Sequence, residues 1–138
     1  VLLLDYGFPR REFYHPQRGR GTLMCHYRHY AHTDPFYLPG LQDVTAHVDF
    51  TAIAAAADGA GLDVLGYTSQ GRFLLECGIL DRLSEIPNAS TEYLRAASAV
   101  NKLLLPHEMG ELFKVIALGR GLDEPLCDFV SGDQCHRL

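Results

Sequence analysis

The segment that most restricts the fold is residues 111–119, ELFKVIALG, which is almost continuously apolar after its first residue apart from Lys114. A strand that is apolar on both faces is typical of the buried sheets of α/β proteins, where other elements cover both sides. Residues 1–6, VLLLDY, have the same character and are closed by Gly7 and Pro9. Both segments therefore predict strands that are buried on two sides in an α/β fold.

The segments between these two strands predict helices and one further strand. Asp49 and Ser90 are suitable N-cap residues, and Pro106 would end the helix that Ser90 begins. In chain order we expect a strand at 1–6, a long loop at 8–41, a helix at 50–58, a strand at 62–69, a short helix at 70–77, a turn at 80–83, a helix at 91–105 and a strand at 111–119. Three strands are too few for an independent parallel sheet, so we expect part of a larger one.

The charge of the chain is unevenly distributed. Its net charge is −5, but residues 1–32 hold five Arg against two acidic residues, giving +3, and the remaining 106 residues give −8. An acidic chain argues against a nucleic-acid partner, and no apolar run approaches the roughly 18 to 20 residues of a membrane span. The basic segment near the expected cleft could be a lid or a platform for a protein substrate, or simply a solvated loop.

The long loop at 8–41 contains no lasting hydrophobic period, but it is rich in aromatic residues. Such side chains favour an ordered segment, because their burial offsets the entropy lost on ordering. They are Phe8, Phe13, Tyr14, Tyr27, Tyr30, Phe36 and Tyr37.

The cysteines indicate the cellular compartment of the chain, and its first residues indicate whether it is part of a larger protein. None of Cys25, Cys77, Cys127 and Cys135 forms a CxxC pair, which is typical of reduced thiols in an intracellular protein. The first four residues, VLLL, contain no initiator Met and no signal-peptide features. We therefore expect a portion of a larger protein.

Several short motifs together resemble the MidA-like methyltransferases, a family that includes the mitochondrial arginine methyltransferase that assists the assembly of respiratory complex I. Each motif is weak by itself, but their order and spacing are specific and extend over most of residues 1–121. They are LLLDYG at 2–7, GTL at 21–23, the HxxH at His29 and His32, PG at 39–40, DVTAHVDF at 43–50, Gln70, FL at 73–74 and FKVIALG at 113–119.

The resemblance implies the C-terminal part of a seven-stranded Rossmann-like (class I) methyltransferase fold. In such folds the strand order is 3-2-1-4-5-7-6 and the last strand is antiparallel. Residues 1–6, 62–69 and 111–119 would be strands five, six and seven with flanking helices, and the seventh would lie between the other two. Residues 1–121 would be the C-terminal half of the methyltransferase domain, with 8–41 as a loop insertion, and the tail at 122–138 would fray.

The resemblance also implies S-adenosylmethionine as the cofactor of the intact parent protein. The glycine-rich loop that holds it follows the first strand of the fold, which this chain lacks. The GRG at 19–21 is no substitute, because it has neither a strand directly before it nor a helix after it. We expect no cofactor in this chain by itself and no activity. Its strand at 1–6 would present an open edge for self-association or for another chain.

The family resemblance and the expected sheet both place the end of the first strand near a substrate. Ligands of open α/β sheets bind beyond the carboxyl ends of the strands, so Asp5, Tyr6 and Gly7 are candidate substrate-binding residues. The alternative is local, with Asp5 capping the following turn and Tyr6 packing in the core.

A second constellation consists of Asp43, Thr45 and Asp49. If the methyl acceptor is an arginine, Asp43 and Asp49 could orient its guanidinium as catalytic residues, because carboxylates bind that fork in a bidentate manner. Thr45 would contact the substrate. The alternative is that Asp49 caps the helix and Asp43 forms a turn.

The histidines could in principle hold a metal ion. His26, His29 and His32 repeat every three residues, with Cys25 beside them and His47 later. On a helix three such positions spread over roughly 240°, and on a strand they alternate between faces, so a zinc site, and with it a metal-dependent hydrolase, is disfavoured. His29 and His32 are instead predicted to bind substrate or to fix the long loop.

The predicted function is therefore part of an S-adenosylmethionine-dependent protein methyltransferase, with an arginine linked to respiratory complex I as a candidate acceptor. The alternative is a subdomain that binds a partner and carries no chemistry. The expected location is the cytoplasm of a bacterium, or the mitochondrial matrix of a eukaryote.

Overall fold

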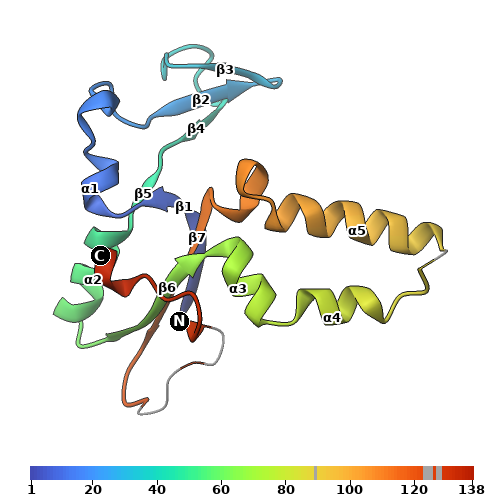
Figure 1. The fold of residues 1–138 in the computed structure, drawn as a ribbon. Helices are drawn as coiled ribbons and strands as arrows, with labels where there is room; N and C mark the ends of the chain where they lie inside the picture. The colour runs from blue at the N-terminus through green and yellow to red at the C-terminus, as the bar shows by residue number, and fades with distance from the viewer. Residues whose placement is uncertain (89, 123–125, 127–128) are drawn as a thin grey trace.

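The computed structural model describes residues 1–138 apart from 89, 123–125 and 127–128, and it is a mixed α/β structure (Figure 1). Its main sheet has the order β5-β1-β7-β6. The strands are β1 (Leu2–Phe8), β5 (Val48–Asp49), β6 (Asp63–Ser69) and β7 (Phe113–Gly119). β1 is parallel to β5, whereas β7 is antiparallel to both β1 and β6. The predicted position of the last strand between its two predecessors is confirmed, and the remainder of a seven-stranded sheet stays a prediction.

The centre of the core is β7, whose side chains are buried on both faces as its sequence predicts. One face packs against α2 (Phe50–Gly59) together with Cys135 and Leu138, and the other packs against Phe129. The first cluster joins Ile116 and Leu118 to Phe50, Ala57 and Tyr67, and the second joins Val115 and Ala117 to Phe129. Lys114 is also buried, and its ammonium group donates to the backbone carbonyl oxygen of Glu111.

β1 differs from the prediction, because its first half is not covered. Leu2, Leu3 and Leu4 are 52%, 39% and 47% exposed. The reason is that residues 2–6 pair with β7 on one side only, while β5 reaches only Gly7 and Phe8 on the other. The expectation of a strand buried on both faces is therefore wrong within this chain, and the expected open edge is present. The strand also continues through Gly7 to Phe8.

The helices follow the sequence signals closely. The Asp49 side chain caps α2 by accepting a hydrogen bond from the Ala52 amide at 3.1 Å, and Ser90 Oγ caps α5 by accepting from the Tyr93 amide at 3.0 Å. A helix forms at 79–84 where only a turn is predicted. The helices after β6 are α3 (Gln70–Glu76), α4 (Ile79–Ser84) and α5 (Thr91–Leu104), followed by the π-turn η2 (Pro106–Gly110). None of the helices in the described part of the chain is long and apolar enough to cross a membrane.

The expectation of an irregular loop at 8–41 is wrong. This stretch forms α1 (Arg10–Phe13), the 3-10 turn η1 (Pro16–Arg18), β2 (Met24–Tyr27) and β3 (Tyr30–His32). With β4 (Asp43–Thr45) the two strands make a second sheet of order β3-β2-β4, which lies apart from the main sheet (Figure 1). Arg28 and His29 form the hairpin turn with φ of 47° and 67°. Such turns usually carry Asn-Gly, so Arg-His gave no turn signal in the sequence.

The expectation that the chain frays after Gly121 is wrong for residues 129–138. Phe129 is 4% exposed and lies over Gly66, where a Cβ atom would come within 2.3 Å of the Phe129 ring. The Gln134 amide donates to the Tyr67 carbonyl oxygen at 2.6 Å, and the 3-10 turn η4 (Cys135–Arg137) follows. The domain division at 121 stays a prediction, and Cys127 lies outside the described residues. Cys25 and Cys135 are free thiols.

Candidate functional site

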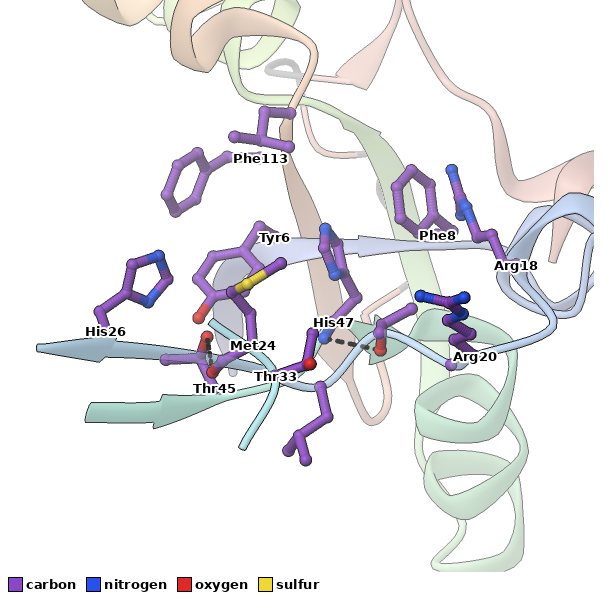
Figure 2. Close-up of a pocket in the computed structure, with 14 residues that line it drawn as sticks. Tyr6, Phe8, Arg18, Arg20, Met24, His26, Thr33, Thr45, His47 and Phe113 are labelled. Atoms are coloured by element: carbon purple, nitrogen blue, oxygen red, sulfur yellow. Dashed lines mark hydrogen bonds between the residues drawn. The ribbon is translucent and has the colours of Figure 1, made fainter. Parts of the chain in front are cut away.

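A cleft of about 860 Å³ lies between the main sheet and the three-stranded sheet (Figure 2). It is situated where β1 ends and the antiparallel β7 begins, so both strands contribute to the same wall. The residues that line it are Tyr6, Phe8, Arg18, Arg20, Gly21, Thr22, Leu23, Met24, His26, Thr33, Thr45, His47, Leu112 and Phe113.

The three-stranded sheet contributes to the cleft with one of its two faces. Met24 on β2 is paired with Thr45 on β4, and both line the cleft together with His26. Because successive side chains of a strand point to opposite faces, Cys25 faces away from the cleft. Cys25 is paired with His32 on β3 and is completely buried. Strands β2 and β4 thus have one face that lines the cleft and an opposite face that packs within the protein.

An aromatic group forms the wall of the cleft on the side of the main sheet. The Tyr6 ring is perpendicular to the rings of His47 and Phe113, with centroids 5.3 and 5.6 Å away. The Phe8 ring is stacked on His47 at 4.9 Å. The His47 amide donates to Thr22 Oγ1 at 3.2 Å, which fixes this residue against the loop before β2.

The surroundings of His47 favour the neutral form of its imidazole. Its burial lowers the pKa of the ring below the usual 6.5, and the positive charge of Arg18 lowers the pKa further. Within the described residues, Nδ1 of this ring is buried and has no hydrogen-bond partner.

The charged groups of the cleft are all basic. The Arg18 guanidinium lies over the Phe8 ring, 3.6 Å from the centroid, and its Nη1 donates to the Glu12 carbonyl oxygen at 2.8 Å. Arg20 is exposed and makes no ion pair with any described residue. No Asp or Glu occurs among the described residues that line the cleft.

Of the predicted substrate-binding residues, Tyr6 and Thr45 line the cleft, and Asp5 and Gly7 do not. Asp5 is exposed, and its Oδ1 accepts a hydrogen bond from the Tyr6 amide at 2.8 Å. Gly7 is buried against β5, where a Cβ atom would lie 2.2 Å from the Val48 carbonyl oxygen. The close approach that requires glycine here is therefore to the backbone of this chain.

Neither predicted catalytic aspartate lies among the described residues that line the cleft. Asp43 is exposed on β4, paired with His26 of β2. Asp49 caps α2, and its Oδ2 also accepts a hydrogen bond from Arg10 Nε at 3.4 Å. Both oxygens of this carboxylate are thus already engaged within the chain.

His29 and His32 lie on the β2–β3 hairpin, and neither is among the residues that line the cleft. His29 is part of the turn, and His32 faces a second cavity of about 400 Å³, where its Nδ1 accepts from the Asp34 amide at 3.3 Å. The other residues of that cavity are Tyr27, Arg28, Tyr30, Asp34 and Tyr37. No group of three or more His, Cys, Asp or Glu among the described residues could hold a metal ion.

Sequence patterns predicted only part of this site. The basic aromatic segment indicated Arg18 and Arg20, but not that Arg18 lies over Phe8 or that both arginines line one cleft. His47 drew attention only as a possible metal ligand. The alternation within MCHY could have assigned Met24 and His26 to one face, but that requires knowing that residues 24–27 form a strand.

The chain is similar to parts of several methyltransferases. Residues 1–68 match a family of S-adenosyl-L-methionine-dependent methyltransferases. Relatives named protein arginine methyltransferase NDUFAF7, mitochondrial, are 33% identical over 124 residues in Rattus norvegicus and 34% over 125 residues in Mus musculus. Each alignment covers 86% of this chain and 26% of the relative, so the chain spans about a quarter of these proteins.

Two crystal structures of COG1565 superfamily proteins from Burkholderia thailandensis are also similar. Both are 60% identical to this chain, with a TM-score of 0.96 over 99% of it. The match covers 37% of one solved chain and 36% of the other, and the second structure contains S-adenosyl-homocysteine.

Proposed function

Because this chain belongs to the MidA-like family of S-adenosylmethionine-dependent methyltransferases, we propose that it forms the acceptor-binding part of a protein methyltransferase. The position of the cleft carries this proposal. Tyr6 and Phe8, near the carboxyl end of β1, line the cleft, and β1 has a parallel neighbour in β5. Ligands of open α/β sheets bind beyond these strand ends, and the three-stranded sheet provides the opposite wall.

The proposed acceptor is an arginine side chain of a protein. This part of the proposal is supported by the names of the rat and mouse relatives. The finer proposal, that the protein substrate is a subunit of respiratory complex I, rests on the family resemblance. Bacterial cytoplasm and mitochondrial matrix remain the two proposed locations.

We infer that the cofactor is held chiefly by residues outside these 138. S-adenosylmethionine would supply the methyl group, and a glycine-rich turn between a strand and a helix is the usual cradle for such a nucleotide. Here Gly19 and Gly21 follow the 3-10 turn η1 and lead into β2 instead of a helix. The exposed Leu2–Leu4 side chains on the open edge of β1 also support the idea that further structure covers them.

Within the cleft, Tyr6 and Thr45 are the proposed substrate contacts. The Thr45 hydroxyl now donates to the Met24 carbonyl oxygen at 3.3 Å, and its oxygen remains able to accept a hydrogen bond. The roles of Asp43 and Asp49 in orienting a guanidinium, and of Asp5, Gly7, His29 and His32 in binding, stay predictions. Replacing Asp43 or Asp49 by Asn in the whole gene product and measuring methylation would test the catalytic pair.

The central experiment is calorimetric titration with S-adenosylmethionine. The whole gene product that contains this chain is expected to bind it and to transfer a methyl group to protein, whereas the 138-residue chain is expected to bind none. Failure of the whole gene product to bind the cofactor would contradict the proposal.

The open edge of β1 favours a second candidate function, which is that of a partner-binding subdomain that carries no chemistry. Residues 2–6 offer unpaired backbone groups and apolar side chains, which favour association with another strand. Light scattering of the 138-residue chain tests self-association through this edge. A monomer whose edge amides are protected from hydrogen exchange would contradict it.

A further inference from the structure

The charged side chains that line the cleft are positive and favour a negatively charged ligand. Arg18 and Arg20 contribute two positive charges, and no carboxylate of a described lining residue balances them. The chain as a whole carries −5 and its residues after 32 carry −8, so this basic wall is a local feature on an acidic body. Such a local excess of one sign raises the concentration of oppositely charged groups at that place.

Arg18 is fixed in position before any ligand arrives. Its guanidinium is stacked on Phe8 and donates one hydrogen bond to the Glu12 carbonyl oxygen, and the side chain is half-buried. A carbonyl oxygen and a ring face carry no full negative charge, so they leave the charge of Arg18 uncompensated. A guanidinium held in this way loses little further conformational entropy when it binds a carboxylate.

Arg20 supplies the second cation from the same loop. It is exposed and has no ion pair with any described residue, and Figure 2 shows it on the same side of the cleft as Arg18. Neutral hydrogen-bonding groups complete the wall, namely the hydroxyls of Thr22 and Thr33. Hydroxyls and guanidinium groups together are suited to a carboxylate, which has only acceptor oxygens.

A cationic side chain does not fit this wall. Charges of equal sign repel, and no described lining residue offers a carboxylate beside Arg18 and Arg20. Asp43 is on the same face of its sheet as His26, which lies across the cleft from the two arginines in Figure 2. If the acceptor is an arginine, another group of the substrate must therefore face Arg18 and Arg20.

We propose that Arg18 and Arg20 bind the carboxylate of a Glu or Asp side chain that lies close to the methylated residue in the protein substrate. This inference rests on the proposed function and defines the substrate class of the same cleft. The substrate is then a protein segment in which an acidic residue precedes or follows the methyl acceptor. The pair of arginines selects the segment, and the acceptor itself is held by groups outside their reach.

The test is calorimetry on the whole gene product with three capped peptides. They are Gly-Glu-Glu-Gly-Tyr, Gly-Gln-Gln-Gly-Tyr and Gly-Arg-Arg-Gly-Tyr, each acetylated and amidated. The glutamate peptide is expected to bind about tenfold or more tightly than the glutamine peptide, as charge-assisted hydrogen bonds are stronger than neutral ones. Its affinity should fall as salt is raised. Equal binding of these two peptides, or an affinity for the arginine peptide that falls in Arg20→Gln, would overturn the proposal.

Two variants and one control localise the effect. Arg20→Gln removes no hydrogen bond or ion pair within the described residues, and it is expected to weaken binding of the glutamate peptide several-fold. Arg18→Gln is expected to weaken it at least as much. Arg28→Gln removes an arginine of the same basic segment that lies on the hairpin turn outside the cleft, and should leave the affinity unchanged. The same loss in all three variants would mean general charge attraction and would overturn the proposal.

Cofactor titration in the same preparations separates this inference from the proposed function. Cofactor binding without any preference for the glutamate peptide would overturn the inference and leave the function standing. A glutamate preference that depends on Arg20, in a protein that binds no cofactor, would support the carboxylate site and contradict the methyltransferase.

Discussion

Arg18 and Phe8 form a cation–π pair in which the guanidinium carbon lies 3.6 Å from the centroid of the ring. Phe8 belongs to β1 of the main sheet, and Arg18 belongs to the turn before the three-stranded sheet. Phe8 is also stacked on His47, which follows β4 (Figure 2). This contact therefore joins the two walls of the cleft.

The first prediction concerns the free-energy coupling between Arg18 and Phe8. In a double-mutant cycle of Phe8→Leu and Arg18→Gln, urea unfolding should give an interaction energy of about 0.5–2 kcal/mol. Arg28→Gln combined with Phe8→Leu provides the control, because Arg28 contacts Tyr27 instead, and its effect should be additive. Additivity in both cycles would contradict the contact.

The second prediction concerns the contact of Gly7 with β5. Gly7→Ala would place a Cβ atom 2.2 Å from the Val48 carbonyl oxygen, so the backbone must move. The free energy of unfolding should fall by about 2–3 kcal/mol, measured by urea denaturation. Gly59→Ala at the end of α2 has open space around it and should be neutral or stabilising. Similar stabilities of the two variants would argue against the close approach.

The third prediction concerns the docking of the C-terminal residues. Phe129→Ala should lower the free energy of unfolding by about 3 kcal/mol, because it leaves a cavity on the face of the sheet that β6 and β7 form. The neighbouring Val130 is 71% exposed, so Val130→Ala should change stability by less than about 0.5 kcal/mol. An equally small change for Phe129→Ala would show that the tail is not part of the core.

The fourth prediction concerns the pH dependence caused by His47. Its pKa is lower in the folded chain than the usual 6.5, so the unfolded chain binds the proton more readily. The stability that the neutral ring contributes is present above pH 6.5 and is lost as pH falls below it. Urea unfolding between pH 7.5 and 5.5 should therefore show a larger decrease for the wild type than for His47→Gln. Arg18→Gln removes one cause of the lowered pKa, so its decrease in stability should lie between those of the wild type and His47→Gln. Equal decreases in all three proteins would show that His47 is not the origin of the pH dependence.

The fifth prediction separates the capping role of Asp49 from its charge. Asp49→Ala should cost about 1 kcal/mol or more of stability, because the Ala52 amide loses its acceptor. Asp49→Asn keeps a good capping group and loses only the exposed ion pair with Arg10, so it should cost less than Asp49→Ala. Thermal unfolding of both variants checks this, and equal losses would mean that the charge dominates.

Several local features could be predicted because they depend on neighbouring residues. Ser90 and Asp49 each cap the helix that follows them, as their side chains only need to reach an amide three residues on. The apolar run at 111–119 predicted a strand buried on both faces, and residues 113–119 form one. The order of β1, β7 and β6 came from the family resemblance and not from the pattern of residues.

Other features depended on contacts between distant parts of the chain. The hairpin of β2 and β3 turns through Arg28 and His29, whose positive φ angles have no signal in their residue types. The place of Arg18 over Phe8 joins residues that are neighbours only after the two sheets are arranged. The same is true of Phe129 on Gly66, whose lack of a side chain makes room for the ring.

The sequence by itself determined which segments are apolar, where α2 and α5 begin and that an α/β sheet forms, since these follow from side-chain chemistry at a fixed local spacing. Only the tertiary structure decided which polar residues share a cleft. Tyr6, Arg18 and Thr45 meet there because a second sheet folds over the end of β1, whereas Asp43 and Asp49, close to Thr45 in the chain, lie outside it. Asp43 lies on the same face of the three-stranded sheet as Thr45, but next to His26 and outside the lining residues. The N-cap of α2 engages the carboxylate of Asp49 elsewhere.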